Sequence, residues 1–151
     1  MPILKDIIVI KADSSTKEAI TNAKFTFGLY EDPECTKLIK QMDSNKEDGT
    51  VAFEDLRYGT YYIKEIKAPR GYQLSNRIVR IAIDDKGVFV DGEKLEEKDS
   101  VYSFTYYNDL IPKVQTGNEM NYAVLVSSMV ISLIGIAIGS VMIKRKKQKN
   151  N

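Results

Sequence analysis

The stretch Tyr61–Leu74 reads YYIKEIKAPRGYQL and opens with a run of residues typical of a β-strand. Side chains of a strand point alternately to its two faces, so Tyr61, Ile63 and Glu65 share one face. If that face belongs to the core, it ends in a carboxylate, and a buried charge is unfavourable unless it is paired or neutralised. The stretch therefore predicts either a strand end that meets solvent or a buried partner for Glu65.

Two other stretches, IIVIK and FTYYN, show the same arrangement. In each, two apolar residues are followed by one polar residue on the same face: Ile7, Val9 and Lys11 in the first, and Phe104, Tyr106 and Asn108 in the second. Taken alone, each polar residue is explained by a strand that frays to solvent at that end. Taken together, a lysine, a glutamate and an asparagine that end three strand faces favour a common site.

Residues 1–110 read as short strands separated by turns. The candidate strands are rich in valine, isoleucine, phenylalanine and tyrosine, and they read DIIVIKAD, KFTFGLY, TVAFEDL, TYYIKEI, RIVRIAI, VFV and VYSFTYYND. Strands of this length and spacing predict an all-β domain, an antiparallel β-sandwich. We expect no helix in this part of the chain.

The composition excludes several classes of function. There is no histidine, which removes the commonest general base and the commonest metal ligand, and we expect no metal site and no cofactor. Cys35 is the one cysteine, so an internal disulfide is excluded. Residues 144–151 hold five of the 22 basic residues and none of the 21 acidic ones, which leaves residues 1–143 with a net charge of −4. A mildly acidic body argues against nucleic-acid binding.

The C-terminal part of the chain reads as a membrane anchor. Residues 123–143, AVLVSSMVISLIGIAIGSVMI, contain no charge, and a helix of this length spans about 30 Å, the thickness of the hydrocarbon core. The basic tail, residues 144–151, is predicted to be cytoplasmic, which places residues 1–121 outside. The first ten residues, MPILKDIIVI, do not read as an export signal because Lys5 and Asp6 interrupt the apolar run.

A Thr-Gly pair lies shortly before the apolar span. A Thr-Gly strip, an apolar span and a basic tail, in that order, resemble the cell-wall sorting signal of Gram-positive surface proteins. The resemblance implies that sortase, a membrane transpeptidase, cuts between Thr116 and Gly117 and joins Thr116 to an amine. The LPxTG-like pentapeptide reads Lys113, Val114, Gln115, Thr116 and Gly117, without the proline of the usual motif. The alternative is a plain single-pass anchor.

The opening stretch carries a second resemblance. It resembles the E-box, Y-x-L-x-E-x-x-A-P-x-G-Y, of the Cna-B or SpaA-type pilin domain, through Tyr61, Ile63, Glu65, Ala68, Pro69, Gly71 and Tyr72. VIKAD with Lys11 and FTYYND with Asn108 resemble the first and last strands of that family. The resemblance implies a prealbumin-like, Ig-like sandwich over residues 1–110, followed by a linker with the sorting motif at residues 111–122.

The same resemblance implies a chemistry and a function. Lys11 and Asn108 would join in an amide (isopeptide) bond that Glu65 promotes, a single self-maturation that needs no cofactor, so we do not expect an enzyme. The polymerising pilins of the family carry a Y-P-K motif, which is absent here. We therefore expect a small ancillary or basal pilin subunit, exported and linked through Thr116 to other pilin subunits or to peptidoglycan at the cell surface. The alternatives are a stand-alone adhesin or ligand-binding module and an uncleaved single-pass membrane protein.

Overall fold

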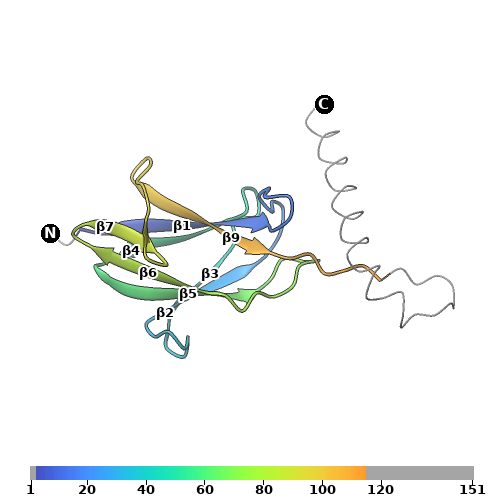
Figure 1. Ribbon diagram of the computed structural model, residues 1–151, viewed down its shortest axis with the longest axis horizontal. Helices are drawn as coiled ribbons and strands as arrows, with labels where there is room; N and C mark the ends of the chain where they lie inside the picture. The colour runs from blue at the N-terminus through green and yellow to red at the C-terminus, as the bar shows by residue number, and fades with distance from the viewer. Residues whose placement is uncertain (1–2, 115–151) are drawn as a thin grey trace.

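The computed structural model describes residues 3–114, which form nine strands (Figure 1). The strands are β1 (Lys5–Asp13), β2 (Thr26–Tyr30), β3 (Leu38–Asp43), β4 (Thr50–Leu56), β5 (Gly59–Lys67), β6 (Ile78–Asp84), β7 (Gly87–Val90), β8 (Glu93–Lys94) and β9 (Val101–Asn108). Within residues 3–114 no helix is long and apolar enough to cross a membrane. The predicted anchor at 123–143 and the basic tail at 144–151 lie outside the described residues.

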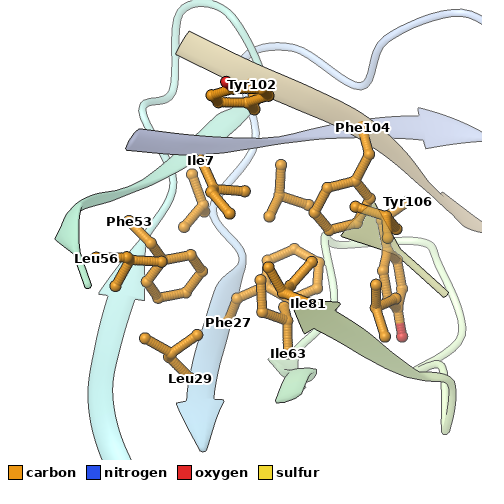
Figure 2. Packing of buried hydrophobic residues seen from close by; sticks show 14 of the residues in the cluster. Ile7, Phe27, Leu29, Phe53, Leu56, Ile63, Ile81, Tyr102, Phe104 and Tyr106 are labelled. Atoms are coloured by element: carbon orange, nitrogen blue, oxygen red, sulfur yellow. The ribbon is translucent and has the colours of Figure 1, made fainter. Parts of the chain in front are cut away.

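Two sheets face each other and enclose the core (Figures 1 and 2). One has the order β4-β1-β9, and the other has the order β3-β2-β5-β6-β7-β8. Along β6 and β9 every second side chain is buried, as a strand with one face on a core requires. The buried faces supply Ile7, Phe27, Phe53, Ile63 and Tyr106, none of which exposes measurable surface. The all-β architecture is the one that the sequence predicts.

The prediction of a wholly antiparallel sandwich is wrong at one strand pair. β1 and β9 run parallel over eight register positions, from Asp6 opposite Val101 to Asp13 opposite Asn108. An antiparallel partner joined by a hairpin needs only a short turn, whereas a parallel partner needs a long connection. The rest of the domain lies between β1 and β9 in the sequence and provides that connection. Both strands therefore run from the N-terminal end of the domain towards the end where the chain continues to residue 114 (Figure 1).

The sequence analysis did not predict two of the strands, β3 and β8. β3 lies at the edge of its sheet, and all of its residues except the half-buried Met42 are exposed. β8 has only two residues, both exposed. Neither strand buries a face, so neither has the alternation of apolar and polar residues that reveals a half-buried strand in a sequence.

Candidate functional site

The three polar residues that end predicted strand faces meet in the interior. Lys11 lies on β1, Asn108 on β9 and Glu65 on β5, and their side chains are at most 2% exposed. β1 and β9 are neighbours in one sheet, whereas β5 belongs to the sheet that faces it. Lys11 is opposite Tyr106 in the register, so Asn108 is its diagonal neighbour on the same buried face. The site therefore joins the two layers of the sandwich.

The three side chains form a closed ring of hydrogen bonds. Lys11 Nζ donates to Oε1 of Glu65 and to Oδ1 of Asn108. Asn108 Nδ2 donates to Oε2 of Glu65 at 2.7 Å. The two oxygens of one carboxyl group therefore face two nitrogens, that of the lysine amine and that of the asparagine carboxamide.

Backbone groups of the β5–β6 loop complete the site. Asn108 Nδ2 donates its second hydrogen to the carbonyl of Gln73 at 2.8 Å, and the N–H of Ser75 donates to Oε2 of Glu65 at 2.9 Å. Among the described residues, no buried side-chain nitrogen or oxygen lacks a hydrogen-bond partner. Each side-chain nitrogen and oxygen of the polar cluster thus has at least one partner, which a buried charged site needs in order to be stable.

Aromatic rings surround the amine of Lys11. Its Nζ lies 4.3 Å from the ring centroid of Tyr106, 4.8 Å from that of Phe27 and 5.8 Å from that of Phe25. The rings of Phe27 and Tyr106 pack edge to face with centroids 4.9 Å apart, within the core drawn in Figure 2. The Tyr106 hydroxyl donates to the carbonyl of Arg77 at 2.7 Å, which fixes the orientation of its ring. These rings exclude water from the amine.

Burial changes the acidity of the lysine. Desolvation lowers the pKa of Lys11 from 10.5 to about 8, although the hydrogen bond with Glu65 acts in the opposite direction. At a pKa of about 8, roughly a tenth of the amines are neutral at pH 7, compared with less than about a thousandth for an ordinary lysine. Only the neutral amine carries the lone pair that a nucleophile needs. The site therefore raises the fraction of Lys11 that is in the reactive, neutral form.

The second half of the stretch Tyr61–Leu74 connects the loop after β5 to the segments beside the site. Gly71 has a φ of +90°, which residues with a Cβ rarely adopt, and its carbonyl accepts from the N–H of Ile111 at 2.8 Å. The Tyr72 hydroxyl donates to Oδ2 of Asp13 at 3.0 Å. The loop after β5 is thus fastened both to the end of β1 and to the segment that follows β9.

The remaining predicted site residues have simpler positions. Ile63 is a core residue, and Tyr61 donates from its hydroxyl to the carbonyl of Arg57 at 3.0 Å. Pro69 is buried and Ala68 is half-buried. In the predicted sorting motif, Lys113 and Val114 are exposed, and Gln115, Thr116 and Gly117 lie outside the described residues.

Sequence reasoning did not find Gln73 and Ser75. Both residues bond to Asn108 and Glu65 through backbone groups, a carbonyl and an N–H, which every residue other than proline possesses, and the Ser75 hydroxyl is also hydrogen-bonded to the Tyr106 hydroxyl at 3.0 Å. Their side-chain types therefore gave no signal.

Comparison with protein families gives one match. Residues 5–96 match the model of the SpaA family, described as a prealbumin-like fold domain. The matched region includes Lys11 and Glu65 and ends before β9, which carries Asn108. No curated protein matches the chain significantly.

Comparison with solved structures returns proteins of Gram-positive pili. The pilus 2b backbone protein of group B streptococcus is 22% identical with a TM-score of 0.51, over 70% of this chain and 41% of that one. A variant of BcpA, the major pilin subunit of Bacillus cereus, is 23% identical with a TM-score of 0.51, over 72% and 30% of the two chains. The minor pilin GBS52 of Streptococcus agalactiae is 17% identical with a TM-score of 0.52, over 79% and 50%. The chain spans half or less of each of these proteins, and the likeness concerns the fold.

Proposed function

Because the chain belongs to the SpaA family of prealbumin-like fold domains, we propose that it is a pilin-type subunit of a Gram-positive cell surface and that Lys11 and Asn108 become joined by an amide bond. The observation that carries the bond is the buried contact of Lys11 Nζ with both Asn108 Oδ1 and Glu65 Oε1. The fold shared with pilus backbone and minor pilin proteins supports the pilin assignment.

The reaction joins one amine and one carboxamide. The neutral amine of Lys11 attacks Cγ of Asn108, the Nζ–Cγ bond forms, the Cγ–Nδ2 bond breaks, and ammonia leaves. Glu65 accepts the proton that Nζ loses through Oε1 and delivers a proton to Nδ2 through Oε2. Atoms balance without an oxidant, a metal or a cofactor. Because each chain reacts once with itself, the process is maturation rather than enzymatic turnover.

The cellular role follows from the order of segments in the sequence. One sandwich domain precedes the Thr116-Gly117 pair, the apolar span at 123–143 and the basic tail. In the proposed role, the apolar span holds an exported precursor in the membrane until sortase cleaves after Thr116. The chain then becomes a small ancillary or basal subunit, joined through Thr116 to another pilin subunit or to peptidoglycan.

Intact-mass spectrometry tests the bond directly. The full chain should weigh about 17 Da less than its sequence mass, because one ammonia is lost when the amide forms. Glu65→Gln should restore the full mass, since glutamine has no carboxyl group to transfer the proton. Glu54→Gln, an exposed glutamate on β4, should keep the deficit and serves as the control. A wild-type chain of full mass would refute the crosslink.

Attachment to the cell surface tests the pilin role. In a Gram-positive host that encodes the chain, Thr116→Ala should remove it from covalent high-mass material that resists boiling in detergent, whether pilus ladders or cell-wall fragments, and deletion of sortase should do the same. Asn121→Ala, which changes a residue outside the pentapeptide, should leave the ladder unchanged. Unchanged ladders in Thr116→Ala would contradict cleavage at this site, and a chain that is wall-linked but never in a ladder would favour the stand-alone adhesin.

A further inference from the structure

The nitrogen that would leave Asn108 faces two acceptors at once. Its distances are 2.7 Å to Oε2 of Glu65 and 2.8 Å to the carbonyl oxygen of Gln73. A carboxamide nitrogen carries two hydrogens and satisfies both acceptors. The opposite side of the same group presents Oδ1 to Lys11, which donates. The donors and acceptors around the Asn108 carboxamide thus distinguish its Nδ2 from its Oδ1.

We propose that the carbonyl of Gln73 makes this site selective for a carboxamide, so that asparagine reacts with release of ammonia and aspartate is rejected. The inference rests on the proposed crosslink and adds a specificity-determining group to it. An aspartate at position 108 would place a carboxylate oxygen against the two acceptors, with no hydrogen for either. Even a protonated aspartic acid has one hydrogen for two acceptors, and an unsatisfied buried polar group is unfavourable.

The carbonyl of Gln73 is held in place from several sides. The N–H of Gln73 donates to the carbonyl of Asp109 at 2.8 Å, and its Nε2 donates to the carbonyl of Leu110 at 3.2 Å. One residue earlier, Tyr72 pairs with Leu110 in an isolated bridge. The loop is therefore tied to the residues that directly follow Asn108, and the carbonyl has little freedom to turn away from an unsuitable side chain.

The same contacts orient the reacting carbon. Because Nδ2 is held by two acceptors, Oδ1 points to Lys11 and a flipped carboxamide is unfavourable, since its oxygen would face Gln73 and Glu65. In the reaction, Nζ–Cγ forms and Cγ–Nδ2 breaks while the departing nitrogen already lies against Glu65, its proton donor. With aspartate the leaving group would be water, which Glu65 could protonate but which, before it leaves, has at most one hydrogen for the two acceptors.

The test compares the rates of bond formation for two residues at position 108. The full chain is recovered unfolded in urea and diluted into buffer with detergent at pH 7, and intact mass is followed with time. The native sequence should lose about 17 Da, whereas Asn108→Asp should lose about 18 Da, as water, at least a hundredfold more slowly. An aspartate variant that reacts within tenfold of the native rate would overturn the proposal.

A second comparison isolates the role of Gln73. Gln73→Gly removes the side-chain tie to Leu110 and loosens the backbone, while Leu74→Gly makes the same change at an exposed neighbour and serves as the control. The ratio of asparagine to aspartate rates should fall at least tenfold in Gln73→Gly and stay unchanged in Leu74→Gly. A merely structural role would slow both reactions alike and leave the ratio unchanged, which would refute the specificity.

If the aspartate variants do not fold, the contribution of Gln73 to the asparagine reaction remains testable. With Asn108 intact, Gln73→Gly should form the bond at least tenfold more slowly than Leu74→Gly, and equal rates would count against the proposal. Failure of the crosslink itself would be recognised separately, because the native chain would then show no loss of mass.

Discussion

Pulling the full chain by its two ends should leave the crosslinked domain almost unextended, whereas Glu65→Gln should lengthen by about 340 Å when its domain unfolds. Lys11 and Asn108 are 97 positions apart, and an extended residue spans at most about 3.5 Å. In the native chain the proposed bond bypasses these positions. Single-molecule force spectroscopy measures the gain in length at each unfolding event.

The path of the force explains the size of this effect. β1 and β9 lie side by side and parallel, and the chain enters at one end of the domain and leaves at the other (Figure 1). Force applied to the ends would pass along β1 to Lys11, through the side-chain amide to Asn108, and on to the segment that follows. β1 is already extended, so its own stretching adds little length. With the proposed bond in place, the strands between would carry no load.

Glu54→Gln provides the matched control for the pulling experiment, because it makes the same chemical change at an exposed position of β4. It should behave as the native chain does. Full extension of the native chain would contradict the bond, or would place it between residues other than Lys11 and Asn108. An extension much shorter than about 340 Å in Glu65→Gln would mean that a second link remains.

Loss of the bond should also lower the free energy of unfolding by about 4–5 kcal/mol. A covalent link that closes a loop of 97 positions removes conformational entropy from the unfolded chain, by analogy with a disulfide. For a domain of this size, such a change corresponds to a fall in melting temperature of roughly 20 °C. Lys11→Met and Asn108→Leu each remove the bond and replace a buried polar side chain with an apolar one of similar size. Thermal and urea unfolding followed by circular dichroism measure the loss.

A double-mutant cycle separates the bond from the other effects of these substitutions. Each single variant loses the stability that the bond provides, and the double variant loses it only once. The loss of unfolding free energy in the double variant should therefore be about 4–5 kcal/mol smaller than the sum of the two single losses. The dependence of stability on urea should also steepen, because the unlinked unfolded chain exposes more surface. Lys86→Met changes an exposed lysine and should leave both quantities unchanged. Simple additivity of the two single losses would contradict the bond.

The strands that bury one face could be predicted because their sequence alternates. β1, β5 and β9 were each recognised from apolar residues at every second position, and the same alternation identified Lys11, Glu65 and Asn108 as polar residues on otherwise apolar faces. Edge strands β3 and β8 gave no such signal because neither has a buried face. The grouping of the three polar residues into one site came from this shared pattern, and the resemblance to the E-box added the amide bond between Lys11 and Asn108 and the promoting role of Glu65.

By itself, the sequence determined that the domain is all-β and which side chains interrupt its apolar faces, because the direction of a strand side chain depends only on its place in the alternation. The tertiary structure decided that β9 runs parallel to β1, that Glu65 reaches the site from the opposite sheet, and that Gln73 and Ser75 complete it. These features depend on which strands and loops meet in space. Such pairing is set by packing between residues far apart in the chain, and backbone groups take part in it whatever side chain they carry.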